Sequence, residues 1–190
     1  MSQKINTKLW ITTGLSLLLL GLMTAPAMGA AFLKFDGVDS EATSEGHDKW
    51  IDILSFSQSV ALPVGSSSGG SSRPTGASER TPFVVAKVLD KTSPQLAQSC
   101  VSGEKFTEVL IDLATTGSKK TIVYMQYKLS NVFIASYSVS GNSDDRPTEE
   151  IALNYEKIEW KFIEVDNTGN PKPGGQHIGS WDFATNQPIK

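Results

Sequence analysis

The segment Pro147–Phe162, with the sequence PTEEIALNYEKIEWKF, constrains the fold most because the parity of its apolar positions changes partway along. The first apolar set is odd-numbered and the second even-numbered: Ile151, Leu153 and Tyr155, then Ile158, Trp160 and Phe162. Side chains alternate across a strand, so an unbroken strand would put the two sets on opposite faces. A β-bulge near Glu156–Lys157 would return both sets to one core and bend the strand. The segment therefore predicts a bent strand in an all-β domain.

Most of the remaining chain also shows the composition and alternation of strands. Six further extended ranges are expected at 32–36, 50–60, 83–89, 106–113, 121–129 and 132–139, the last two joined at Ser130-Asn131. The exception is Pro94–Cys100, which follows the N-cap candidates Thr92 and Ser93, precedes Gly103, and is predicted to be helical. The predicted fold class is mainly β: a β-barrel or sandwich of antiparallel sheets with one short lateral α-helix and a long extended loop.

Four collinear segments resemble the hemolysin-coregulated protein (Hcp) family, the tube subunit of the type VI secretion system. Besides PTEEIALNYEKIEW they are AFLKFDGVDSEATSEGHDKWIDILSFS at 31–57, FVVAKVLDKTSPQLAQSCVSGEKFTEVLIDL at 83–113 and WDFATNQ at 181–187. Together they span nearly all of residues 31–187. The resemblance implies the Hcp-like β-barrel, a six-membered ring of identical subunits, stacking of rings into a hollow tube that carries effectors, and contacts with spike and sheath proteins.

The N-terminus departs from the family pattern, in which the chain begins near the residue that matches Ala31. Lys4 and Lys8 precede the apolar run Ile11–Met23, and small residues follow at 24–31, which is the layout of a cleavable secretory signal peptide. The apolar run is shorter than the roughly 20 residues of a membrane-spanning helix. We expect a signal peptide at 1–30, a domain at 31–190, no stable membrane insertion after cleavage, and a periplasmic or secreted product. Cleavage after Ala27, Gly29 or Ala31 fits the pattern, and translation from Met28 would instead give a cytoplasmic protein.

Charge and cysteine content exclude several function classes. The chain has 17 basic and 20 acidic residues, and the leader holds two lysines and no acid, so the mature domain would stand near −5. This charge, and the scatter of the basic residues, argue against nucleic-acid binding. Cys100 is the single cysteine, so no internal disulfide can form, and with no histidine adjoining it in sequence it is interpreted as a buried, inert thiol.

Two turn-rich segments are the candidates for contacts between subunits. The segment Pro63–Pro82 is crowded with Gly, Ser and Pro, and the family resemblance implies that it lies between subunits or against the next ring. Its only charges, Arg73, Glu79 and Arg80, are the candidate contact residues. The second segment, 166–179, is also turn-rich; the family resemblance implies that it is a hairpin loop at a ring edge, and it adds His177.

No motif in the sequence indicates catalysis, a metal or a cofactor. The acidic stretch with one histidine, formed by Asp36, Asp39, Glu41, Glu45, His47 and Asp48, fits neither an EF-hand nor a paired-histidine zinc motif and is interpreted as a surface connection. We therefore expect a structural protein rather than an enzyme. Two alternatives stay open: an exported ring former that is not coupled to a secretion machine, and a monomeric binding module that would present surface aromatic residues to a ligand.

Overall fold

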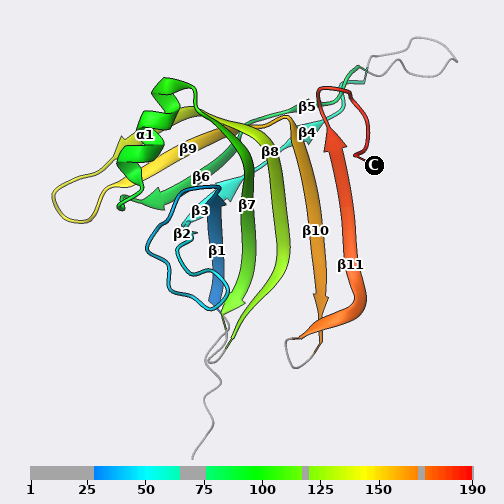
Figure 1. The fold of residues 1–190 in the computed structure, drawn as a ribbon, viewed down its shortest axis with the longest axis horizontal. Helices are drawn as coiled ribbons and strands as arrows, with labels where there is room; N and C mark the ends of the chain where they lie inside the picture. The colour runs from blue at the N-terminus through cyan, green and yellow to red at the C-terminus, as the bar shows by residue number, and fades with distance from the viewer. Residues whose placement is uncertain (1–27, 65–75, 117–119, 167–169, 190) are drawn as a thin grey trace, which may run out of the picture.

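The computed structural model describes residues 28–64, 76–116, 120–166 and 170–189. Its elements are β1 (Met28–Phe35), β2 (Ile51–Asp52), β3 (Ser55–Ser57), β4 (Val60–Ala61), β5 (Glu79–Arg80), β6 (Phe83–Val88), α1 (Ser93–Ser102), β7 (Lys105–Thr116), β8 (Thr121–Ser140), β9 (Thr148–Asn154), β10 (Lys157–Val165) and β11 (Pro171–Asp182). All strand pairs are antiparallel, and the single described helix lies beside the upper part of the barrel (Figure 1). The mainly β fold with one lateral helix is confirmed.

The 20-residue strand β8 belongs to two arms of the same curled sheet. Its first half pairs with β10, which pairs in turn with β11, and its second half pairs with β9, which leads to β6 and β3. On its other side β8 pairs along most of its length with β7, which pairs with β1. The strands β1, β7, β8, β10 and β11 therefore form one continuous layer, with β1 and β11 at its two sides (Figure 1).

The parity change occurs where the chain passes from β9 to β10. Asn154 pairs with Phe133 before the break and Lys157 pairs with Ser130 after it, so two residues on each strand lie between these pairs. Opposite these residues, Asn131 has φ +55°, in the left-handed region, and interrupts the side-chain alternation of β8 at the same level. The alternation of inward and outward side chains therefore shifts on both strands at the same level. The pairing register is the same on either side of the two intervening residues of each strand. The predicted return to one core is confirmed for Ile158, and the half-buried Trp160 packs against that core, but Phe162 is 46% exposed. The predicted β-bulge at Glu156–Lys157 is wrong.

Several predicted segments have different boundaries in the structure. The single strand expected at 50–60 is divided into β2, β3 and β4, while 121–129 and 132–139 are the one strand β8. Most of the loop expected at 166–179 is strand, because β11 begins at Pro171. The first strand begins at Met28 and so includes residues 28–30, which the sequence assigned to the leader. The helix predicted at 94–100 is confirmed as α1, with Gly103 in the left-handed conformation at its C-terminal end.

The apolar core fills the barrel and contains two buried polar networks. The fully buried Lys87 lies 3.0 Å from Asp90 and contacts Glu149, which is also fully buried and accepts a hydrogen bond from the Tyr137 hydroxyl at 2.6 Å. Burial, together with this bond to Glu149, raises the pKa of Tyr137 to about 12. Because Lys87 has its charge partners inside the barrel, this network is structural.

The second network corrects the interpretation of the acidic stretch as wholly surface-exposed. His47 is buried, its Nε2 lies 2.9 Å from Oδ2 of Asp112, and its ring stacks on Phe32 at 4.1 Å. The other carboxylate oxygen of Asp112 accepts a hydrogen bond from Gln126 at 2.7 Å. His47 thus holds the connection between β1 and β2 against the sheet. Its role is in packing.

Candidate functional site

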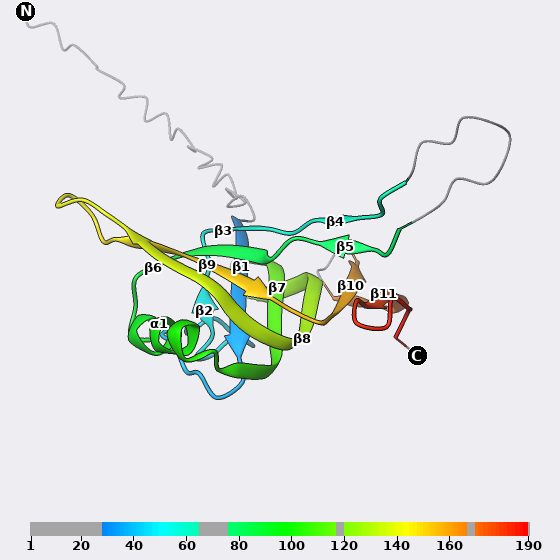
Figure 2. The ribbon, with the colours of Figure 1, turned by 90° about the horizontal axis from the view of Figure 1, so that it is seen from above.

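The most prominent surface feature is an arm, residues 60–80, of which the structure describes 60–64 and 76–80. It is built on the short pair β4 and β5, in which Val60 faces Arg80 and Ala61 faces Glu79. A bond from Gly76 N to Pro63 O, 3.0 Å long, continues the pairing outward. The described parts of the arm extend away from the barrel (Figures 1 and 2).

A group of contacts that we call the clasp ties the base of the arm to the C-terminal end of the chain. The backbone N–H and the hydroxyl of Ser78 both donate to Oδ1 of Asn186, at 3.0 and 2.6 Å. The indole of Trp181 donates to the Ser78 hydroxyl at 2.7 Å. The guanidinium of Arg80 lies 4.8 Å from the ring centre of Phe183, and its Nη2 donates to Oδ1 of Asn154 at 3.3 Å. The clasp therefore fixes the direction in which the arm leaves the barrel.

The turn that carries Asn186 is itself held by Asp182. Its Oδ1 accepts bonds from the backbone N–H groups of Ala184 and Thr185, at 2.9 and 3.2 Å, and its Oδ2 lies 2.9 Å from Nζ of Lys157. The hydrogen bond from Lys157 lowers the pKa of the Asp182 carboxyl, and the two backbone bonds lower it further. Asn186 has φ +54°, a conformation that asparagine tolerates better than most residues. The ionised form of Asp182 is thus the one that supports the clasp.

An apolar cleft of about 330 Å³ lies between the base of the arm and the sheet. Its lining consists of Val60, Ala61, Leu62, Ser78, Trp160, Trp181 and Phe183. Val60 and Leu62 are each about half exposed, and Trp160 is half-buried. The cleft is an open apolar surface beside the arm, and its aromatic side chains come from β10, β11 and the residue that follows β11.

The two sides of the five-stranded layer differ in how they are covered. Among the described residues, β11 pairs with no strand other than β10, and Gln187 bridges its last residue, Asp182, so its outer edge is open from Pro171 to Trp181. β1 pairs with β2 only at Phe32 and Leu33, and within the part of the chain that the structure describes no strand pairs with the outer edge of residues 28–30. A groove of about 350 Å³ runs beside that edge, lined by Gly29, Ala30, Ala31, Ile53, Leu54, Ser55, Phe56, Leu113 and Tyr124. Open edges with main-chain donors and acceptors are sites where another chain can add.

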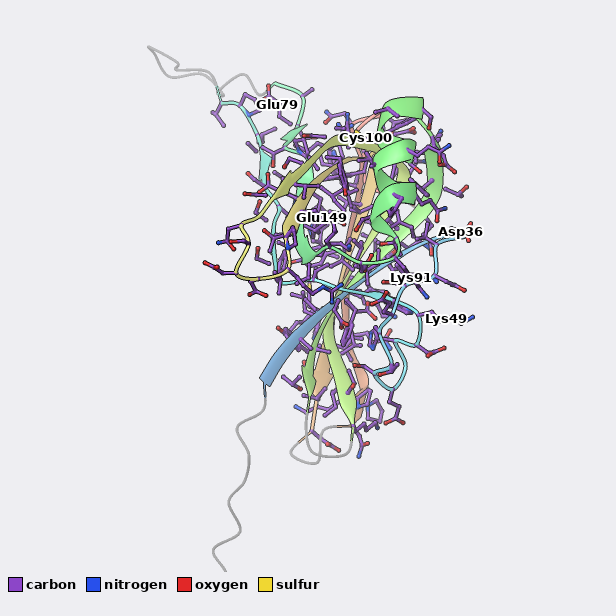
Figure 3. The ribbon with its side chains drawn as sticks, turned by 90° about the vertical axis from the view of Figure 1, so that its left-hand side faces the viewer. Asp36, Lys49, Glu79, Lys91, Cys100 and Glu149 are labelled. Atoms are coloured by element: carbon purple, nitrogen blue, oxygen red, sulfur yellow. The ribbon has the colours of Figure 1, made fainter. Side chains whose placement is uncertain are left out.

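The candidate contact residues lie in different settings. Glu79 is exposed on the arm, well apart from the interior Glu149 (Figure 3), whereas Arg80 is turned toward its own barrel in the clasp. His177 lies on β11, where Nε2 is 2.9 Å from Oε1 of Glu164. That contact, with help from Lys172, lowers the pKa of Glu164. Arg73 lies outside the described residues.

Sequence reasoning missed Ser78, Trp181 and Asn186 as determinants of the arm. The segment WDFATNQ was singled out only for its family resemblance, and nothing in its composition indicates that it reaches Ser78, more than 100 residues earlier. Cys100 is half-buried and unbonded rather than fully buried. Within the described ranges no group of three or more His, Cys, Asp or Glu residues could hold a metal ion, and no helix is long and apolar enough to cross a membrane.

Comparison with known proteins places this geometry in a family. Residues 32–162 match the family model described as "Type VI secretion system effector, Hcp", which covers more than half of the chain. The chain belongs to the Hcp family. It is accordingly a tube subunit of the type VI secretion system, and the function predicted from the sequence is confirmed at this level.

Individual Hcp proteins support the assignment. Protein hcp1 of Pseudomonas aeruginosa is 25% identical over 82% of this chain and 95% of its own length. The "Major exported protein" of the same species is 31% identical over 65% of this chain and 74% of its own length. A solved type six secretion system protein superposes with a TM-score of 0.78 at 28% identity, covering 85% of this chain and 100% of that one. Hcp1 of Salmonella typhimurium, at a TM-score of 0.68 and 21% identity over 85% of this chain and 99% of its own, shares the fold.

Proposed function

We propose that this Hcp protein closes into a homohexameric ring through the two open sides of its β1–β7–β8–β10–β11 layer, and that such rings stack into a tube. The observation that carries the proposal is the position of the open edges of β1 and β11 on opposite sides of one layer. A ring needs a heterologous interface, in which one face of a subunit meets a different face of its neighbour. Two different edges on opposite sides of the same layer satisfy that requirement.

Strand direction supports the same assembly. Every neighbouring pair in the layer is antiparallel, so the first strand, β1, and the fifth strand, β11, run in the same direction. Successive subunits of a cyclic ring would therefore present β11 and β1 to one another in parallel. Covering each edge with the next subunit removes the aggregation hazard of open strands.

A cross-linking experiment tests ring closure. A variant with C100S, Gly29→Cys and Lys172→Cys places one thiol on each open edge, and Gly29 has room because a Cβ there meets no atom within 4 Å. A short bis-maleimide should give a ladder of covalent oligomers that ends at the hexamer. The control with C100S, Gly29→Cys and Ser102→Cys moves one thiol to the exposed end of α1 and should give no ladder. Monomeric adducts alone from the first variant would contradict the proposal.

The arm is the element that we assign to stacking. It extends beyond the barrel, and the clasp holds its base in one direction, which supports a contact with a subunit of the next ring. Glu79, exposed on β5, and Arg73 are the charged contact candidates of this segment, whereas Arg80 serves the clasp. Spike, sheath and effector proteins are the further partners implied by membership of a type VI secretion tube.

We also propose that the chain is exported with cleavage of its N-terminal signal peptide. Lys4 and Lys8, the apolar run Ile11–Met23 and the small residues that follow support the proposal. The related "Major exported protein" of Pseudomonas aeruginosa is named for export. Fractionation of cells that produce the full chain tests this: a shortened product in the periplasm or medium supports export, and a full-length product held in the cytoplasm contradicts it.

The aromatic cleft favours one second candidate, a monomeric binding module. Such a module requires surface aromatic residues, and Trp160, Trp181 and Phe183 line an open cleft. Sizing of the mature protein separates the two candidates, because a stable monomer over a wide concentration range supports the binding module and a ring-sized particle supports the tube subunit.

A further inference from the structure

We infer that the bond cleaved on export is Ala27–Met28, and that Met28 is the first residue of the mature subunit. The inference rests on the proposed export. Signal peptidase hydrolyses this bond by adding water across the amide, which leaves a carboxylate on Ala27 and an amine on Met28. The sequence alone admits cleavage after Ala27, Gly29 or Ala31, and the structure separates these three positions.

The strand β1 pairs with β7 from Met28 to Phe35. In the ladder between β1 and β7, Met28 pairs with Thr116, Gly29 with Thr115 and Ala30 with Ala114. Cleavage after Gly29 would remove two residues of this ladder, and cleavage after Ala31 would remove four. Cleavage after Ala31 would also remove the Ala31 carbonyl, which accepts a hydrogen bond of 3.0 Å from the N–H of Ile53 and holds the chain that leads out of β2. Cleavage after Ala27 leaves the whole strand in place.

The position of the new α-amino group gives an independent argument. Cleavage after Ala31 would put a charged amine on Phe32, which is only 2% exposed. Cleavage after Gly29 would put it on Ala30, which is half-buried and packs beside Phe32, Ala42 and Ala114. Placing a charged group beside buried apolar side chains is unfavourable. Cleavage after Ala27 instead leaves the charge at the outer end of the strand, before the exposed residue Gly29.

The local sequence agrees with the structural argument. Ala25 and Ala27 form the A-x-A pattern of small residues directly before the proposed bond. The mature subunit then keeps Gly29 and Ala30, which form the open edge of β1 and line its groove. The same edge is the one assigned above to ring closure, so this cleavage position yields a subunit whose interface is complete.

Three variants of the full chain test the inference, with the N-terminus of the exported protein read by intact mass and terminal sequencing. In Gly29→Leu the leucine directly precedes the bond that would be cleaved after Gly29. It also lies two residues before Ala31, the residue that would precede the bond cleaved after Ala31. It leaves Ala25 and Ala27 untouched, and the added side chain has room. We expect it to be exported and to begin at Met28, as wild type does. A Gly29→Leu protein that keeps its leader would overturn the inference while leaving export intact. A wild-type product that begins at Ala30 or Phe32 would do the same.

The other two variants complete the design. Ala27→Leu should abolish normal processing and leave the leader attached, and unchanged processing there would overturn the inference. Met28→Leu distinguishes cleavage from internal translation, since a cleaved product survives and begins with the substituted leucine, whereas a product started at Met28 disappears. Full-length chain retained in the cytoplasm for wild type would defeat the export proposal itself, and with it the inference.

Discussion

The indole N–H of Trp181 donates to the hydroxyl of Ser78 across 2.7 Å, joining the last strand to the base of the arm. The same hydroxyl donates to Asn186, so one serine connects two positions of the C-terminal segment. The C-terminal sequence WDFATNQ thereby acquires a physical role, since it determines how the arm leaves the barrel. Arm direction matters for any subunit that must meet another copy in a fixed orientation.

Loss of the clasp should free the arm without unfolding the barrel. Asn186→Ala removes the acceptor of both Ser78 bonds, and because the site is exposed we expect a stability loss of only about 1 kcal/mol. Hydrogen exchange at residues 60–64 and 76–80 should become faster. Asn142→Ala is the matched control, since its side chain accepts a bond from the Asp144 N–H in the distant loop between β8 and β9. Equal exchange in both variants would show that Asn186 does not hold the arm.

Acid should loosen the clasp through Asp182. Because the folded-state pKa of Asp182 is lowered below its ordinary value of 3.8, its contribution to stability is present above that pH and is lost as the pH falls through the folded pKa. Arm exchange should therefore accelerate below about pH 4. Asp182→Asn should show fast arm exchange at all pH values. Asp39→Asn, which removes another carboxyl of lowered pKa next to Lys34 and Lys49, should leave the arm unaffected.

The buried pair Lys87–Glu149 should be sensitive to the loss of one partner and tolerant of the loss of both. Lys87→Met leaves the buried carboxylate of Glu149 without its cation, and we expect a loss of about 3–5 kcal/mol in urea unfolding. The double variant K87M/E149Q should recover a large part of that loss. Lys172→Met breaks an exposed pair with Glu164 and should cost less than about 1 kcal/mol. A small effect of Lys87→Met alone would mean that water reaches this network.

Trp160 and Ile158 provide a test of where the core ends along β10. Ile158 is fully buried, and Ile158→Ala should cost about 2–5 kcal/mol. Trp160 is half-buried at the cleft, so Trp160→Ala should cost about 2 kcal/mol, less than the truncation of a fully buried tryptophan. Urea unfolding of both variants measures the two losses. A larger loss for Trp160 than for Ile158 would show that the cleft is closed in solution.

The sequence predicted the strand content and the helix because both depend on local patterns. The change of parity between Tyr155 and Ile158 correctly indicated a bend, but its mechanism depends on Asn131, which lies on the partner strand. Similarly, Pro171 and Pro173 suggested a loop, whereas an edge strand tolerates proline because its outer N–H groups are unpaired.

The candidate site was harder to predict because its parts meet only in the folded chain. Arg80 was selected as a charge in a polar loop, but Phe183 and Asn154 engage it within the subunit. His47 was interpreted as part of a surface segment, although pairing with Asp112 allows the ring to be buried. In each case the deciding partner lies more than 60 residues away, where spacing and composition carry no information.

The central claim is that open edges close the ring while the arm stacks it. The most direct measurement is electron microscopy with mass determination of chain 28–190, wild type and with residues 65–75 deleted. We predict ring-sized particles for both and stacked tubes for wild type alone, since the deletion spares every described strand and the clasp. Monomers in wild type, or undiminished tubes after the deletion, would contradict the account.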